Sequence, residues 1–295
     1  MGGNAFEGLT RIQREDIDPT LRYVACVLDF PGLTFEYMKN NLMGSAGKQD
    51  DSGDLDIAMD QELFDHRVLY RLADRCREVF GNEKVNSKGL KADQLNTVMP
   101  ILSNSTNDFN RYVQVDFIYG DSDWLKFSHW SPGKDRSPFK GVLISQTLGV
   151  LAKMNVLFRY PKTDDPNLRQ AEVAFAYNLE RGLSVRCRLR RKDGSFGQVD
   201  EDTFETKCPV IPPRVPRFGF MNDPETVVRL CVGKGVKPAD IETFEDLLSV
   251  LRKTRSNEWW ENFKGRLVNS LMRSSVKKEM SRDELNQLLR QFTKS

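Results

Sequence analysis

The sequence predicts an α+β protein in which a mixed β-sheet flanked by helices is followed by a β-hairpin region and a helical C-terminal part. Short runs rich in β-branched and aromatic residues, bounded by glycines and polar residues, predict strands in the first two thirds of the chain. Apolar residues three and four positions apart predict helices near both ends. We expect three parts, which comprise residues 1–158, 159–220 and 221–295.

The strand-forming runs and the helical spacing of apolar residues predict the individual elements. In the first part, helices are predicted over residues 18–33, 60–81 and 142–156. Strands of the same part are predicted over residues 54–57, 97–102 and 111–120. In the second part, residues 183–192 predict a strand that leads into a hairpin turn at Asp193-Gly194. In the third part, Asp223-Pro224 predicts the start of a helix, and a further helix is predicted over residues 241–252.

Two carboxylates occupy alternate positions of the first predicted strand. Because side chains alternate along a strand, Asp54 and Asp56 point to one side, whereas Leu55 and Ile57 point to the other. Hard cations such as Mg²⁺ take oxygen ligands and complete their shell with water and substrate phosphates. The pair therefore predicts a magnesium site that faces a triphosphate, with Mn²⁺ as a possible substitute.

A third carboxylate, Asp116, is the only acid in the strand predicted over residues 111–120. If this strand pairs beside the first one, Asp116 joins Asp54 and Asp56. Three carboxylates can hold two metal ions, which stabilise the attacking and leaving oxygens of an in-line displacement, and Asp116 would help to deprotonate the attacking hydroxyl. The alternative interpretation is a calcium-like structural site or a set of solvated carboxylates.

A glycine-serine turn precedes the acidic pair. Gly44 lets backbone N–H groups approach phosphate oxygens, and the Ser45 hydroxyl adds a further donor. Lys48 adds a positive charge nearby. These three residues are predicted to bind the nucleotide, so phosphoryl transfer is the leading interpretation.

The composite pattern resembles the nucleotidyltransferase superfamily typified by DNA polymerase beta, over roughly residues 20–145. Its parts are the Gly-Ser pair, the Asp-x-Asp pair and a lone Asp about sixty residues later, and Ser52-Gly53-Asp54-Leu55-Asp56 is similar to a run in the family X polymerases. The resemblance implies a polymerase-beta-like palm. It also implies that Asp54 and Asp56 bind both metal ions, that Asp116 binds the catalytic ion, and that Gly44 and Ser45 hold a triphosphate such as ATP.

The sequence differs from the family X polymerases before Gly44, and this difference excludes one of their reactions from what we expect. Forty-three residues precede Gly44, fewer than the lyase and helix-hairpin-helix modules of family X polymerases require. We therefore expect no templated DNA repair synthesis.

A row of arginines marks the predicted hairpin region. In a strand, Arg186, Arg188 and Arg190 share one face. Such rows can contact the phosphates of a nucleic-acid acceptor, but surface strands also carry arginine for solubility and edge protection. Both interpretations stay open.

The C-terminal part carries the local excess of positive charge. Residues 252–282 contain nine Lys or Arg against three Glu. Trp259, Trp260 and Phe263 are interleaved with these charges and could stack bases, although aromatic residues at helical spacing more often form a buried face. The acceptor is therefore expected to be an RNA or DNA end, with a small molecule or a protein side chain as alternatives.

Composition adds limits on location and partners. The net charge is only +2, so whole-chain electrostatics do not require nucleic acid. Five scattered cysteines predict reduced thiols rather than a zinc site. With neither an apolar signal core nor a run of eighteen apolar residues, we expect a cytoplasmic protein without a membrane partner.

Taken together, the residues predict an enzyme, a metal-dependent nucleotidyltransferase. The alternative is a non-catalytic nucleotide-binding or interaction protein that retains the same fold. Because all three carboxylates and the Gly-Ser pair are present, and a pocket without catalysis would not need them, the enzyme is favoured.

Overall fold

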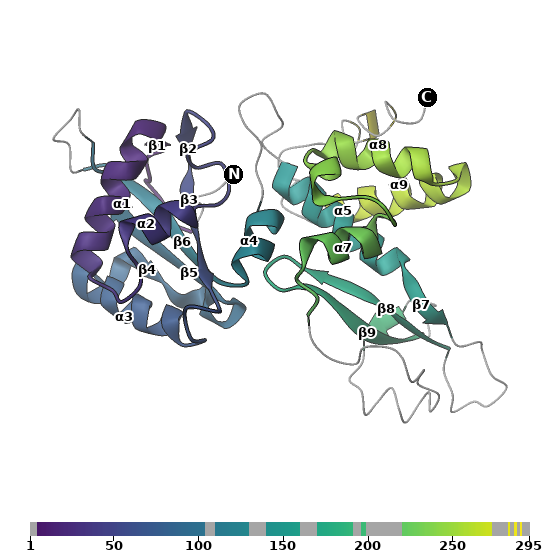
Figure 1. Ribbon diagram of the computed structural model, residues 1–295, viewed down its shortest axis with the longest axis horizontal. Helices are drawn as coiled ribbons and strands as arrows, with labels where there is room; N and C mark the ends of the chain where they lie inside the picture. Colours follow the sequence, from purple (N-terminus) through teal and green to yellow (C-terminus); the bar gives the residue numbers. More distant parts are fainter. Residues whose placement is uncertain are drawn as a thin grey trace. The chain divides into compact units, whose positions relative to one another are not determined.

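The computed structural model contains two compact units, residues 1–141 and 142–295 (Figure 1). Both units combine helices with a four-stranded sheet, which confirms the predicted α+β class. Among the helices that the structure describes, none has the length and apolarity needed to cross a membrane. The predicted division into three parts stays a prediction. The described residues are 5–103, 110–129, 140–159, 170–190, 196–198, 220–272, 283, 286–287 and 290.

The first unit is built on a mixed sheet with the strand order β3-β6-β5-β4. Strands β3 and β6 are parallel, and the β6–β5 and β5–β4 pairs are antiparallel. A separate antiparallel pair joins β1 to β2. The elements in chain order are β1 (Ile12–Gln13), α1 (Arg14–Leu28), α2 (Phe35–Asn40), β2 (Asp51–Ser52), β3 (Asp54–Asp60), α3 (Val68–Phe80), β4 (Val85–Asn86), β5 (Gln94–Pro100), β6 (Tyr112–Gly120) and α4 (Ser122–Ser128).

One face of this sheet is covered by α1 and α3 (Figure 1). Residues at odd positions of the strands, such as Leu55, Val115 and Leu95, are fully buried in the core that these helices complete. Because side chains alternate along a strand, the even positions project from the opposite face. That face holds the acidic side chains of β3 and β6 and the amide side chains of β5 and β6, together with the buried Ala58, Val98 and Ile118.

Two predicted helices of this unit have different bounds in the structure. Helix α1 ends at Leu28 rather than at residue 33, because Asp29 adopts a left-handed conformation with φ 42° and its N–H bonds the Ala25 carbonyl. Helix α3 begins at Val68 rather than at residue 60. The preceding residues belong to a turn in which the Asp65 carboxylate accepts the N–H of Arg67, at 2.7 Å.

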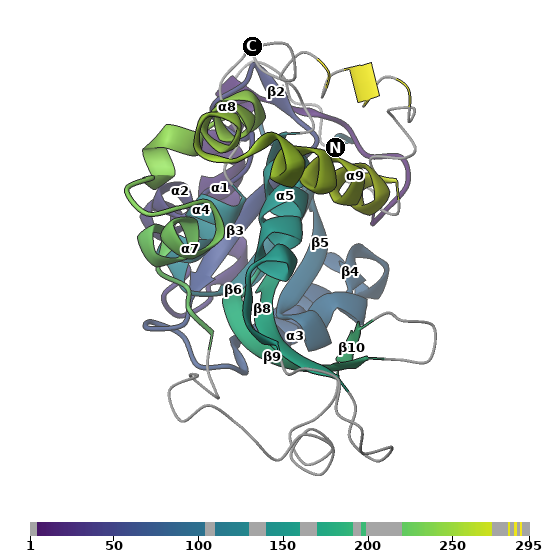
Figure 2. The same cartoon turned by 90° about the vertical axis from the view of Figure 1, so that its right-hand side faces the viewer.

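The second unit is built on an antiparallel sheet with the order β10-β9-β8-β7. Figures 1 and 2 both place α9 beside α5, and Ser270 Oγ donates a 3.0 Å hydrogen bond to Gln146 Oε1 between them. Its elements are α5 (Lys140–Met154), β7 (Val156–Arg159), β8 (Ala171–Asn178), β9 (Gly182–Arg190), β10 (Phe196–Gln198), α7 (Pro224–Cys231), α8 (Phe244–Thr254) and α9 (Asn257–Leu271).

Several predictions for this unit can be compared with the structure. Strand β9 covers residues 183–190 of the predicted arginine strand, whereas residues 191–192 and the turn at Asp193-Gly194 lie outside the described residues. Helix α7 begins as predicted, since the Asp223 carboxylate caps it and Pro224 opens it. On α9, Trp260 and Phe263 are buried, which favours the interpretation of these aromatic residues as a buried helix face. The basic segment beyond residue 272 lies outside the described residues apart from single positions.

Candidate metal centre

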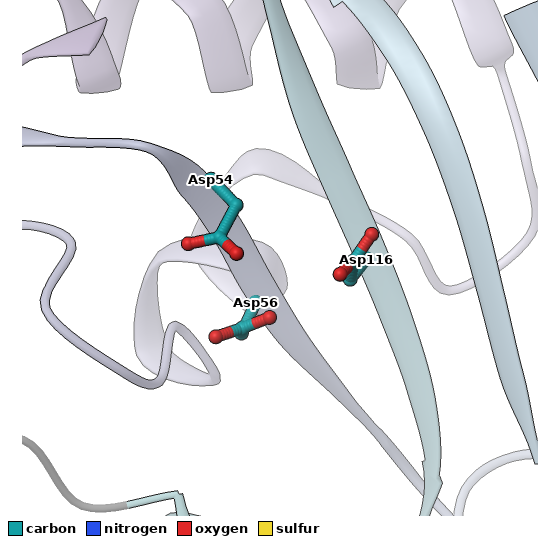
Figure 3. Close-up of side chains that lie close together, drawn as sticks. All are labelled: Asp54, Asp56 and Asp116. Carbon is teal, nitrogen blue, oxygen red and sulfur yellow. The ribbon is translucent and has the colours of Figure 1, made fainter. Parts of the chain in front are cut away.

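Asp54, Asp56 and Asp116 converge on the face of the mixed sheet that lies opposite α1 and α3 (Figure 3). Each offers one carboxylate oxygen, and these three oxygens lie within 4.8 Å of one another. Alternation along β3 brings the first two together, and the parallel β3–β6 register places Asp56 directly opposite Asp116. The convergence expected from the sequence is therefore present in the folded chain.

Burial makes this cluster electrostatically unfavourable without a cation. Burial raises the pKa of Asp116 to about 6, and the charge of Asp54 acts in the same direction. The pKa of Asp56 is raised well above its ordinary value by burial first, and then by the charges of Asp54 and Asp116. A divalent ion would offset this repulsion, and oxygen ligands of this kind suit Mg²⁺ or Mn²⁺. The donor set therefore fits the predicted metal.

Three amide side chains surround the Asp116 carboxylate. Gln114 Nε2 donates to both Asp116 oxygens at 2.9 Å, and Asn96 Nδ2 donates to Oδ1 at 2.7 Å. Gln94 Nε2 donates to Oδ2 at 3.3 Å. These bonds oppose the effect of burial on the pKa of Asp116. Gln94 and Asn96 were not predicted as site residues, although their alternate spacing on a strand places them on one face.

The predicted nucleotide-binding turn lies directly beside the triad. The N–H of Met43 donates to the Asp56 carbonyl at 2.8 Å, which ties the start of the turn to β3. Gly44 has a φ of 65°, in the left-handed region that favours glycine. A Cβ atom on Gly44 would lie 2.8 Å from Oδ2 of Asp56, so the turn can approach the carboxylate only because this residue has no side chain.

Ser45 holds the turn closed. Its carbonyl accepts the N–H groups of Lys48 and Gln49, at 3.1 and 3.2 Å, and its hydroxyl lies 2.8 Å from the hydroxyl of Ser52. Among the described residues, none accepts a hydrogen bond from the N–H of Ala46 or Gly47. These groups are donors of the kind that an anion-binding turn presents.

Lys48 lies on the same turn. Its Nζ donates to the Gly44 carbonyl at 3.1 Å, and burial lowers the pKa of the ammonium. The side chain thus returns to the start of the turn, which places a cation beside the position predicted for the triphosphate.

The predicted acceptor-binding arginines lie in the second unit, and each has a different local partner. Arg188 forms an ion pair with Glu172 at 3.2 Å, and this carboxylate is only 5% exposed. Arg190 is exposed and donates to Gln170 Oε1 at 2.8 Å. Arg186 lies over the ring of Phe220, 5.9 Å from its centroid. The three side chains therefore differ in how readily they can reach a phosphate.

Comparison with known proteins adds no assignment to this geometry. Scanned against models of known protein families, the sequence matches none, and a search among curated proteins finds no match.

Proposed function

We propose that this protein is a metal-dependent nucleotidyltransferase that moves a nucleoside monophosphate from a nucleoside triphosphate to a hydroxyl acceptor. The observation that carries this proposal is the convergence of Asp54, Asp56 and Asp116 directly beside the turn at Gly44. We further propose that the first unit is a palm-like catalytic part.

The three carboxylates would hold Mg²⁺ or Mn²⁺. When bound, two divalent ions would neutralise charge on the phosphates and stabilise the attacking and leaving oxygens. Asp116 lies on the neighbouring strand, opposite Asp56, and would help the acceptor hydroxyl to lose its proton to solvent by holding an ion beside it. Asp54 and Asp56 share one face of β3 and would anchor the ions against the triphosphate.

The turn would bind the triphosphate. Backbone donors at Ala46 and Gly47, the Ser45 hydroxyl and the Lys48 ammonium lie on one short segment that begins beside Asp56. Phosphate oxygens accept such bonds well, because several N–H groups and a cation act on the same anion.

The acceptor is proposed to be an RNA or DNA end. Arg186 and Arg190 offer the phosphate contacts, whereas Arg188 is neutralised by its buried partner. A chain that binds nucleotides without catalysis is the alternative, and the activity assay separates the two.

The decisive assay incubates the protein with each labelled nucleoside triphosphate, Mg²⁺ or Mn²⁺, and panels of RNA, DNA, small-molecule and protein acceptors. We expect label transfer by the natural sequence and loss of at least about 100-fold in Asp116→Asn, with nucleotide binding retained. Asp123→Asn is the matched control, because this exposed acid in the first turn of α4 lies outside the triad. Nucleotide binding without transfer to any acceptor would favour the non-catalytic alternative, and full turnover by Asp116→Asn would remove Asp116 from the mechanism.

A further inference from the structure

A row of polar side chains crosses the face of the mixed sheet that lies opposite α1 and α3. Asp56 on β3 lies opposite Asp116 on β6, which in turn lies opposite Asn96 on β5. Asn86 on β4 continues the row, opposite Asn96. The carboxylate pair is thus followed outward by amides rather than by lysine or arginine.

The Asp116 carboxylate already accepts four hydrogen bonds. Oδ1 accepts one from Asn96 and one from Gln114, while Oδ2 accepts one from Gln114 and one from Gln94. An ionised carboxylate has about four lone-pair sites. A cation can therefore coordinate Asp116 closely only if one of these donors gives way.

The four bonds are not equivalent. Gln114 is 3% exposed and its two bonds measure 2.9 Å, and the Asn96 bond is the shortest at 2.7 Å. The Gln94 bond is the longest at 3.3 Å, and its side chain is only partly buried. Of the four hydrogen bonds, the one from Gln94 should therefore require the least free energy to break.

The orientation of the Gln114 amide is determined by its other end. The backbone N–H of Ala5 donates to Gln114 Oε1 at 3.0 Å. An N–H group can only donate, so the oxygen of this amide must face Ala5 and the nitrogen must face Asp116. The N-terminal segment thereby holds Gln114 in the orientation that donates to the carboxylate.

We propose that Asn96 and Gln114 are positioning residues that hold Asp116 for a divalent cation, and that Gln94 is the displaceable donor whose place the cation takes. This inference rests on the metal site of the proposed function. Neutral amides suit the role because they orient a carboxylate without the positive charge that would repel the ion. Partners of this kind commonly decide metal affinity without touching the metal.

The test measures Mn²⁺ binding directly, by the loss of the electron paramagnetic resonance signal of free Mn²⁺, in protein without nucleotide. Asn96→Leu and Gln114→Met keep the side-chain shape and remove the donors, and we expect each to weaken binding by about 10-fold to 100-fold. Gln94→Met removes the competing donor, and we expect binding that is equal to or tighter than that of the natural sequence. Asn86→Leu is the matched control, one strand further along the same row, and should bind Mn²⁺ unchanged.

The direction in which each variant changes the Mn²⁺ affinity shows whether a residue positions Asp116 or only supports the fold. A merely structural role would lower the unfolding temperature in EDTA without this pattern of Mn²⁺ affinities, so unfolding in EDTA is recorded for every variant. Asn96 is less buried than Gln114, so Asn96→Leu is the variant more certain to fold. If Gln114→Met does not fold, Asn96→Leu alone decides the outcome. Unchanged Mn²⁺ affinity in a folded Asn96→Leu protein overturns the positioning role, and weakening of about 10-fold or more by Gln94→Met overturns the displaceable role.

The experiment also distinguishes failure of this inference from failure of the proposed function. If the variants show the expected Mn²⁺ pattern but no triphosphate is consumed, the function is wrong and the positioning roles stand. If transfer is observed and the variants bind Mn²⁺ like the natural sequence, only the positioning roles are wrong. A natural sequence that binds no Mn²⁺ overturns both.

Discussion

Gly44 stands so close to Asp56 that a Cβ atom on the glycine would lie 2.8 Å from the carboxylate oxygen Oδ2. Cβ atoms in proteins essentially never lie this close to another heavy atom. Any other residue at this position would therefore displace either the turn or the carboxylate. The turn and the candidate metal centre are therefore one structural unit.

Replacing Gly44 with alanine should impair the site more than the fold. The left-handed φ of 65° costs alanine roughly 1–2 kcal/mol of stability, and the new methyl group displaces the Asp56 carboxylate. We expect Mn²⁺ binding and nucleotide transfer each to fall by at least about 10-fold. Gly235→Ala is the matched control, because its φ is 86° and nothing lies within 4 Å of its Cβ position. Equal activity of the two variants would contradict the coupling.

Without metal, the stability of the protein should fall as the pH rises through the acidic range. Burial raises the pKa of Asp116 to about 6, so the folded state binds a proton more tightly than the unfolded state, where Asp titrates near 4. The free energy of unfolding should therefore decrease between about pH 4 and pH 6, by up to about 3 kcal/mol. Asp56 acts in the same direction.

Urea denaturation in EDTA at several pH values measures this effect. Asp116→Asn should flatten only part of the decrease, because Asp56 is still buried, and should be the more stable protein at pH 7, since it removes a buried charge. Added Mg²⁺ should restore stability to the natural sequence at pH 7 but not to this variant, because a ligand stabilises only the state that binds it. If the free energy of unfolding had the same pH dependence in both proteins, a group other than Asp116 would be the one that takes up the proton.

Tyr37 supports the far end of β3 and offers a test of stability alone. Its hydroxyl donates to the Ala58 carbonyl at 2.8 Å and accepts the Asp60 N–H at 2.9 Å. Tyr37→Phe leaves both backbone groups without this partner and should cost about 1–3 kcal/mol, measured by urea denaturation. Tyr70→Phe, at a position that is 49% exposed, should change stability by less than about 0.5 kcal/mol.

The arginines of β9 should separate nucleic-acid binding from folding. If RNA or DNA is the acceptor, Arg186→Gln should reduce the slope of log affinity against log salt by about 0.7 to 0.9, as expected for one lost phosphate contact. Arg188→Met should instead destabilise the second unit by about 1–3 kcal/mol, because it removes the guanidinium that forms an ion pair with the buried Glu172 carboxylate. Absence of any salt-dependent affinity for RNA or DNA would favour a small-molecule or protein acceptor.

The pairing of the two carboxylates on β3 was predictable because it depends only on the alternation of side chains along a strand. Alternation along one strand is enough to place Asp54 and Asp56 together, whatever surrounds them. The pairing of β3 with β6 was also anticipated, but its register, with Asp56 opposite Asp116, depends on packing between residues sixty positions apart. No local pattern determines such a register.

Other features could not be read from the sequence for identifiable reasons. Phe64 fits the helical period of residues 60–81, yet its ring packs edge-on against Tyr37 from a turn, at 5.2 Å between centroids. Gln94 and Asn96 are ordinary polar residues in sequence, and only the folded sheet shows that they face a carboxylate. The ion pair between Arg188 and Glu172 likewise joins two strands.

The central place of β6 in its sheet affects how the protein is made. In sequence β6 follows β3, β4 and β5, yet in space it lies between β3 and β5. A nascent chain on the ribosome therefore carries Asp54 and Asp56 long before it carries the strand that joins the two halves of the sheet. Until residue 116 has been synthesised, the emerging polypeptide lacks the third carboxylate, so the proposed metal site can form only after β6 has joined the sheet.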